Sequence, residues 1–265
     1  MRAPRLSNTR GFTSVRIIAL LATAALVAAS GSTAVAERGY SEATVREVVI
    51  DQGAAPASVT ISTTHDSTPW RDSVRAFAEA HLQHTAWGPA HARRDYEVTL
   101  ALARAEGITV DDDALYAAAY LHDMGGLPPY AKQGVDHGDR SAQLMDSVLR
   151  GTGFPMEKIE LVKEIADHHQ YYRPPDTLAV AILFRDADIL DFLGAIDVAR
   201  IISLTKRERL APDLPSAIEV IRKQMVEMPT RLQTEAAKRE GERRVEEMRH
   251  FLEALSRETD SLRVI

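Results

Sequence analysis

The chain has 265 residues, of which 45% are hydrophobic and 26% charged, and its formal net charge is −6. This composition is typical of a folded globular protein and excludes collagen-like, low-complexity and wholly disordered chains. The acidic balance offers no broad basic surface, so we expect no nucleic-acid partner. Cysteine is absent, which excludes disulfides, Cys-ligated zinc, thiolate nucleophiles and iron–sulfur clusters. Any bound metal must therefore be held by His, Asp or Glu.

The first 36 residues have the three parts of a secretory signal peptide. Four arginines precede any acidic residue, an apolar run covers 17–29, and small residues end at Ala34-Val35-Ala36. The run is shorter than the ~20 residues of a transmembrane helix, which makes an uncleaved membrane anchor the weaker alternative. Removal of 1–36, which contain four arginines and no acid, changes the net charge from −6 to −10. The sequence therefore predicts an exported, periplasmic or secreted protein without stable membrane insertion.

Helices are predicted for most of the remaining chain. Residues 37–68 are interpreted as an N-terminal arm or linker, and 69–265 as an all-α domain. Prolines at helix starts, glycines at helix ends and apolar residues at helical spacing support this interpretation. No long run of alternating apolar and polar residues predicts a sheet. The first expected helix starts at Pro69, the second covers 89–105, and the third runs from a cap at Thr109 or Asp111 to a stop at Gly125-Gly126. The fourth covers 141–149 and the fifth 155–167. A long buried helix is expected over 178–204, and two or more helices over 214–260 with a break near Pro229.

Histidines and aspartates stand where these helices should bury them. Buried carboxylates in an apolar helix are costly unless they are paired or bound to a metal. Imidazole nitrogens together with carboxylate oxygens suit Mn, Fe, Co, Ni or Zn better than calcium. The carboxyl end of a helix also favours a cation beside His122-Asp123. The residues concerned are His91, His122, Asp123, His137, His168, His169, Asp186 and Asp188.

In this order, the residues resemble those of the HD-domain metal-dependent phosphohydrolase superfamily, an all-helical fold named for its His-Asp doublet. Bacterial members carry H-x-x-R-V, L-H-D-I-G and D-A-D-R-L-D-A-L-G-A-I-G. The chain reads HARRD over 91–95, LHDMG over 121–125 and DADILDFLGAID over 186–197. The resemblance extends from about Trp70 to the C-terminus and implies an HD-domain helical bundle for 69–265.

The resemblance also implies the metal ligands, which are His91, His122, Asp123 and Asp188. One or two divalent ions per chain are expected, drawn from Mn, Fe, Co, Ni, Zn or Mg. Helical periodicity leaves Asp186 and Asp188 as alternatives, and the spacing in the superfamily favours Asp188.

Three further residues are implied to act in catalysis: His137, His168 and Arg94. The two histidines match positions that bind a second metal or the substrate phosphate in two-metal members, and His169 is the weaker candidate. Arg94 matches an arginine that could hold a phosphate oxygen with two hydrogen bonds.

The implied reaction is hydrolysis of a phosphate ester, nucleotide-like or another small phosphoester, by a metal-activated water. A small phosphorylated molecule is thus the expected partner. Superfamily members that hydrolyse the alarmone ppGpp carry two acidic residues soon after the doublet, whereas Met124-Gly125-Gly126 stands here, so that activity is not expected. Two alternatives stay open: a metal-stabilised binding module without turnover, and a di-iron HD-type oxygenase. The sequence indicates no oligomeric state.

Overall fold

The computed structural model describes residues 68–175 and 177–265. Within these residues there are helices and turns and no β-strand, in agreement with the all-α prediction. None of the described helices combines the length and apolarity needed to cross a bilayer. The predicted signal peptide, and the predicted arm apart from Thr68, lie outside the described residues.

The helices begin and end largely where proline, glycine and capping residues indicate. Pro69 and Pro89 occupy first turns, and Gly107 closes its helix with a left-handed φ of 68°. Three short 3-10 helices join the main ones: η1 (Met124–Gly126), η2 (Met156–Lys158) and η3 (Met228–Arg231). The α-helices are α1 (Pro69–His81), α2 (Pro89–Glu106), α3 (Asp112–Leu121), α4 (His137–Leu149), α5 (Ile159–Asp167), α6 (Ala179–Asp191), α7 (Gly194–Ser203), α8 (Leu214–Glu227) and α9 (Glu235–Glu258).

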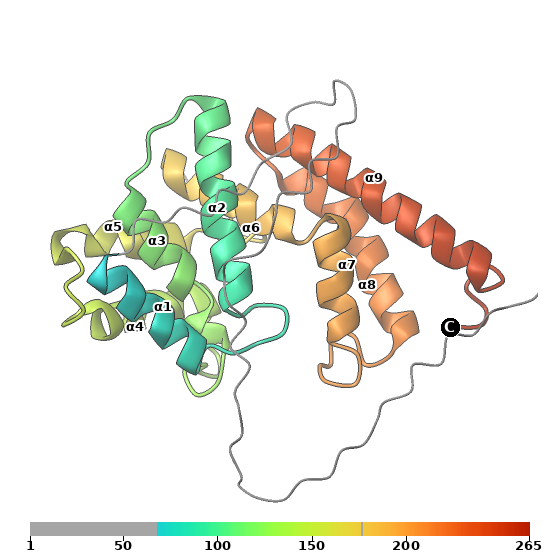
Figure 1. Ribbon diagram of the computed structural model, residues 1–265, viewed down its shortest axis with the longest axis horizontal. Helices are drawn as coiled ribbons and strands as arrows, with labels where there is room; N and C mark the ends of the chain where they lie inside the picture. The colour runs from blue at the N-terminus through green and yellow to red at the C-terminus, as the bar shows by residue number, and fades with distance from the viewer. Residues whose placement is uncertain (1–67, 176) are drawn as a thin grey trace, which may run out of the picture. The chain divides into compact units, whose positions relative to one another are not determined.

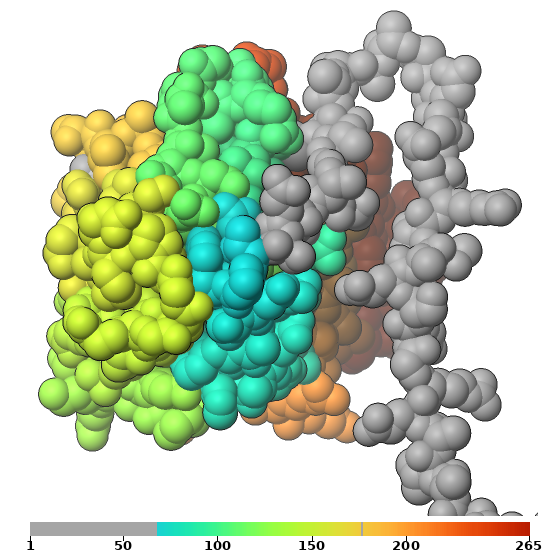
Figure 2. Space-filling view, turned by 60° about the vertical axis from the view of Figure 1, so that its left-hand side comes forward, coloured from blue at the N-terminus to red at the C-terminus, as the bar shows by residue number. Residues whose placement is uncertain are grey.

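Helices α2 and α6 lie side by side between two hydrophobic cores (Figure 1). One core is built with α1, α3, α4 and α5, and the other with α7, α8 and α9. Each central helix contributes to both cores: Phe184 of α6 packs into the first, and Leu183 and Leu190 pack into the second. Figure 2 shows α1 (cyan) on the face of the first core, next to the segments that contain α2–α3 and α4–α5. The central pair is therefore buried on both sides.

The prediction of one long helix over 178–204 is wrong. The helix ends at Asp191, Leu193 is extended, and Gly194 has a φ of +83° before α7 begins. Glycine adopts this conformation without the steric penalty of a side chain. A Cβ at Gly194 would also lie 3.1 Å from the Arg244 side chain on α9. The break therefore lets α7 turn away from α6 and pack against α9.

Two other predicted helix ends are also wrong. The third helix stops at Leu121, and Gly125 and Gly126 lie in the 3-10 turn η1 rather than ending an α-helix. The predicted start of the fifth helix at Pro155 is occupied by the 3-10 turn η2, and α5 begins at Ile159. The α-helical hydrogen bonding of α3 therefore ends at the His122-Asp123 doublet.

Asp186, one of the two candidate ligands on α6, holds the start of α9. Its buried carboxylate accepts hydrogen bonds from the Gln233 and Thr234 backbone N–H groups, at 2.9 and 2.8 Å, and from the Thr234 hydroxyl at 2.7 Å. Burial raises the pKa of Asp186. This carboxylate is thus occupied in joining two helices.

Asp186→Ala is expected to destabilise the protein by about 2–4 kcal/mol, since three donors lose a buried acceptor. Bound metal per chain should stay unchanged. Chemical denaturation and elemental analysis measure the two quantities. The matched control is Asp213→Ala, which removes an exposed cap with a single backbone bond from Ser216 and should cost about 1 kcal/mol. Loss of metal in Asp186→Ala with unchanged stability would contradict the structural role.

Asp197 on α7 is a second buried carboxylate, and neither of its oxygens has a hydrogen-bond partner among the described residues. Burial raises its pKa to about 8, against the opposing effect of Arg200. Between pH 4 and 8 the folded state therefore keeps a proton that the unfolded chain has released. The stability of the wild-type protein must fall as the pH rises through this window.

Asp197→Asn is accordingly expected to be more stable than the wild-type protein at pH 8.5, by about 2 kcal/mol or more. The difference should shrink as the pH falls and disappear near pH 4. Denaturation curves of both proteins from pH 4 to 8.5 measure it, and other titrating groups cancel in the difference. Parallel stability curves for the two proteins would show that Asp197 keeps an ordinary pKa.

Candidate active site

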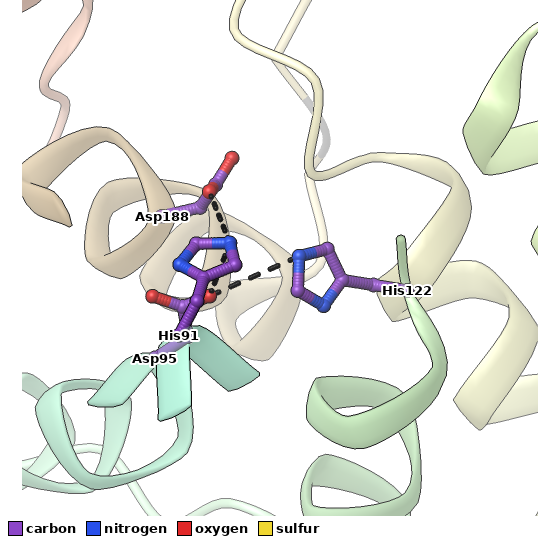
Figure 3. A group of neighbouring side chains, drawn as sticks. All are labelled: His91, Asp95, His122 and Asp188. Atoms are coloured by element: carbon purple, nitrogen blue, oxygen red, sulfur yellow. Dashed lines mark ion pairs between the residues drawn. The ribbon is translucent and has the colours of Figure 1, made fainter. Parts of the chain in front are cut away.

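The two central helices and the end of α3 bring four ionisable side chains to one point (Figure 3). His91 and Asp95 lie one turn apart on α2, Asp188 extends from α6, and His122 enters from the opposite side. His91 Nε2 lies 3.1 Å from Asp95 Oδ2 and 3.4 Å from Asp188 Oδ1. His122 Nε2 lies 3.8 Å from the same Asp95 oxygen. One ligand atom from each residue falls within 4.8 Å of all the others.

Hydrogen bonds fix the orientation of these imidazoles. His91 Nδ1 lies 2.7 Å from Asp191 Oδ2, and His122 Nδ1 lies 2.8 Å from the Ala119 carbonyl oxygen. Each Nδ1 can donate its proton to that oxygen, which leaves the Nε2 lone pair facing the cluster. This pattern is typical of metal-binding histidines, whose second nitrogen is held by a carboxylate or carbonyl group.

The cluster has the features of a cation site. His91 Nε2, His122 Nε2 and both Asp95 oxygens are buried and have no hydrogen-bond partner among residues 68–175 and 177–265. Unpaired buried groups of this kind are costly, and a divalent cation would bind all of them at once. Imidazole nitrogens and carboxylate oxygens, the atoms that these residues offer, bind a metal such as zinc at about 2.0–2.2 Å. His91, Asp95, His122 and Asp188 therefore fit a divalent metal.

Burial and charge act in opposite directions on this cluster. Burial lowers the pKa of His91, but the carboxylates of Asp95, Asp123 and Asp191 together outweigh it and raise that pKa to about 10. Burial raises the pKa of Asp95 itself to about 7. Because a metal requires the neutral imidazole, metal binding would release the proton that His91 otherwise holds.

Asp123 faces two sets of histidines. Its Oδ2 lies 3.4 Å from His122 Nε2 and 3.5 Å from His91 Nε2, while its Oδ1 lies 3.6 Å from His137 Nε2 and 3.7 Å from His169 Nε2. The Nε2 atoms of His137 and His169 are 3.0 Å apart. Burial and the neighbouring His122 lower the pKa of His169 to about 3, so this imidazole is neutral. His122, Asp123 and His169 form a second group with metal-ligand spacing.

Asp136 couples the positions of His137 and His169. It caps α4, on which His137 lies, by accepting a hydrogen bond from the Gly138 N–H. The same carboxylate accepts from Gln170 Nε2 and from the Tyr172 hydroxyl, both at 2.7 Å. The loop that carries His169 is thus held against the start of α4.

Gly125 lets the start of α4 pack closely against the turn that follows the His122-Asp123 doublet. The Gly125 N–H donates to Ser141 Oγ at 2.8 Å, and a Cβ at Gly125 would lie 2.3 Å from the His137 carbonyl oxygen. Any side chain at this position would force α4 away from the loop that follows α3. Gly125 therefore serves close packing at the site.

A cavity of about 500 Å³ opens beside the cluster. Asp123, His137, His169 and Asp188 line it on the side of the cluster, and Trp87, Tyr171 and Phe192 supply aromatic walls. A further wall is formed by Val220 and Gln224 on one face of α8 and by Met228 at the start of η3. A polar cluster that opens into a mostly apolar cavity is typical of a small-molecule site.

The model of the HD domain family matches residues 90–193. These residues form an HD domain. They include every residue of the cluster, whereas α8, which lines the cavity, lies beyond the matched segment.

Several solved structures have a similar fold. Bacillus subtilis YpgQ, solved in complex with ADP, is 20% identical with a TM-score of 0.55, over 71% of this chain and 94% of YpgQ. A predicted HD superfamily hydrolase from an uncultured Thermotogales bacterium is 24% identical with a TM-score of 0.50, over 71% and 90% of the two chains. An HD-superfamily hydrolase from Bacillus thuringiensis is 22% identical with a TM-score of 0.52, over 72% and 95%. Comparison with curated proteins gives no match. These likenesses concern the fold.

Within the HD domain, the structure brings the predicted metal ligands His91, His122, Asp123 and Asp188 together. Asp188 Oδ1 lies 3.4 Å from His91 Nε2, and Asp186 points to α9 instead. Periodicity alone did not distinguish these two aspartates.

The predicted catalytic residues are placed differently from one another. His137 lines the cavity, and so does the weaker candidate His169. His168 is not among the lining residues, and its Nδ1 lies 3.0 Å from the Glu164 carbonyl oxygen. Arg94 donates two hydrogen bonds to Asp191, each 2.8 Å long, and so supports the carboxylate that orients His91. The predicted contact of Arg94 with a phosphate stays a prediction.

Sequence reasoning missed Asp95, a fully buried member of the cluster. The signal was its spacing: Asp95 follows His91 by four residues, which places both on one face of α2. A carboxylate at that position inside a buried helix needs a partner, and the cluster supplies it.

Proposed function

We propose that this protein is a metal-dependent hydrolase of a phosphate ester, with His91, His122, Asp123 and Asp188 as metal ligands. The observation that carries the proposal is the group of unpaired, buried atoms of His91, His122 and Asp95, with Asp123 and Asp188 beside them, next to a cavity of about 500 Å³. The HD-domain match over 90–193 includes these residues and supports the proposed ligands, and the ADP bound to the structurally similar YpgQ supports a phosphorylated small molecule as the substrate.

The chemistry that a bound divalent cation supplies here is activation of water near neutral pH and polarisation of the phosphoryl group. Water adds to phosphorus, the bond from phosphorus to the ester oxygen breaks, and the alcohol leaves with a proton. His137 lies at the cavity and is positioned to hold a phosphoryl oxygen or to protonate the leaving oxygen. The Tyr172 hydroxyl, 3.3 Å from His137 Nδ1, and Asp136 keep this ring in place.

The position of Asp123 is compatible with a site for two metals as well as with a site for one. Its two oxygens face separate histidine sets, His91 with His122 and His137 with His169. If two cations were bound, the two histidine sets and Asp123 would hold them, and the pair would stabilise both the attacking and the leaving oxygen. Mn, Fe, Co, Ni, Zn and Mg are the candidate metals, and availability in the compartment contributes to the choice.

Elemental analysis of the purified protein, followed by a phosphoesterase assay with each metal added back, tests the proposal. We expect one or two divalent ions per chain and release of phosphate or a phosphorylated product. Stoichiometric metal without hydrolysis of any ester would favour a metal-stabilised binding module. Two irons with oxygen consumption would favour a di-iron oxygenase.

His169→Ala is expected to lower kcat/KM by about 100-fold or more, because its neutral Nε2 faces Asp123 and His137. His168→Ala, the matched control at the next position, should change kcat/KM less than about twofold. Steady-state kinetics and metal content of both variants measure the effects. A larger loss for His168→Ala would restore His168, the residue indicated by the family resemblance, as the catalytic one.

We also propose that the protein is exported. The support is the pattern of residues 1–36, with arginines, an apolar run and a terminal Ala34-Val35-Ala36. Expression of the full chain followed by mass spectrometry of the product should give a mature N-terminus at Glu37 and protein outside the cytoplasm. An intact N-terminus in the membrane fraction would support the anchor instead.

A further inference from the structure

The cavity next to the proposed metal ligands has mainly apolar walls and few charged side chains. Its lining includes Trp87, Tyr171, Phe192, Leu210, Val220 and Met228. Tyr171 contacts both Tyr172 and Phe192 edge to face, with ring centroids 5.4 and 5.9 Å apart. Aromatic side chains arranged in this way form a continuous apolar surface.

Part of this apolar surface is exposed. Four large hydrophobic side chains of the described residues are exposed, and two of them, Tyr172 (52%) and Leu210 (48%), lie at the cavity. Grouped apolar surface of this kind is typical of a ligand-binding site. A ligand with an apolar body would cover it.

Positive charge is scarce in the same cavity. Among the described residues, Lys223 is the one lysine or arginine that lines it. Lys223 Nζ lies 4.0 Å from Glu227 Oε2, another lining residue, so the pair adds no net charge. Sites for di- and triphosphates surround the extra phosphates with several cationic groups and backbone N–H donors. Beyond the metal ligands, the described lining offers a second phosphate a single lysine, and that lysine already has Glu227 as a partner.

Building on the proposed function, we propose that the substrate carries a single phosphoryl group on an uncharged, mainly apolar organic body, as an aryl or alkyl phosphate does. The phosphoryl group lies at Asp123, His137 and Asp188, and the organic body lies against the aromatic walls and the α8 face. Helix α8 lies outside the matched segment 90–193, whereas Tyr171 and Phe192 lie within it, so both parts of the chain contribute to this selectivity.

Binding of non-hydrolysable phosphonates to the metal-loaded protein, measured by calorimetry, tests the organic body. Phenylphosphonate should bind about tenfold or more tightly than methylphosphonate, because burial of a phenyl ring removes apolar surface from water. ADP should bind more weakly than phenylphosphonate. Equal binding of the two phosphonates, no binding of either, or tighter binding of ADP would overturn the inference.

Two substitutions on α8 locate the contact. Val220→Asn places a polar, uncharged group on the cavity wall and should lower phenylphosphonate affinity several-fold while leaving methylphosphonate unchanged. Val226→Asn, on the same helix at an exposed position (68%) outside the cavity lining, should change neither. Equal effects of the two variants would contradict the placement of the organic body.

Hydrolysis of phenyl phosphate and ADP by the wild-type protein separates this inference from the proposed function. Faster hydrolysis of phenyl phosphate supports both. Faster hydrolysis of ADP overturns the single-phosphate inference and leaves a metal-dependent phosphohydrolase in place, with a phosphoanhydride rather than an ester as its substrate. Selective phenylphosphonate binding with no hydrolysis of any ester overturns the proposed function and leaves the ligand class in place.

Discussion

His122→Ala is expected to remove bound metal and catalytic activity together. His122 Nε2 lies 3.8 Å from Asp95 Oδ2 and 3.4 Å from Asp123 Oδ2. Its removal would therefore take away a nitrogen ligand that is close to both carboxylates. Outer-shell substitutions at metal sites typically cost 10–100-fold in metal affinity, and loss of a ligand should exceed about 100-fold. Metal titration and phosphoesterase assays measure the two effects.

The control for this variant is His84→Ala. His84 is outside the cluster, and its Nδ1 accepts hydrogen bonds from the backbone N–H groups of Ala86 and Trp87. Its removal should leave the metal content per chain unchanged. Full metal occupancy in both His122→Ala and Asp123→Ala would end the case for this metal centre.

Removal of the metal is expected to lower the melting temperature by about 10 °C. A ligand present at 1,000 times its Kd stabilises the folded state by about 4 kcal/mol, and each kcal/mol shifts Tm by about 2–4 °C in a domain of this size. The physical reason is the cost of the unpaired buried atoms at His91, Asp95 and His122. Thermal unfolding with and without a chelator measures the shift.

The His122→Ala variant serves as the reference for that experiment, because it should melt at the same temperature with and without the chelator. A wild-type protein whose Tm is insensitive to the chelator, after metal loss has been verified by elemental analysis, would show that the cluster is stable without a cation.

Local signals in the sequence predicted much of the helical framework. Pro69, Pro89 and Gly107 mark helix ends because their backbone preferences act within a few residues of the chain. The long helix over 178–204 was mispredicted for a related reason. Its apolar residues contribute to the cores on both sides of the break, so their pattern gives no sign of a helix end. The break at Gly194 depends on the packing of α9 against α7, which are distant in sequence.

The order of His and Asp residues by itself determined the family resemblance and the candidate ligands His91, His122, Asp123 and Asp188. Tertiary structure decided which aspartate of α6 faces His91. Helical periodicity does not distinguish the two, but the start of α9 packs against Asp186 and binds its carboxylate, while Asp188 lies next to His91. It also brought His169 rather than His168 to the cavity and added Asp95 to the cluster. Convergence at a site depends on how distant helices pack, and spacing along one helix contains no information about that packing.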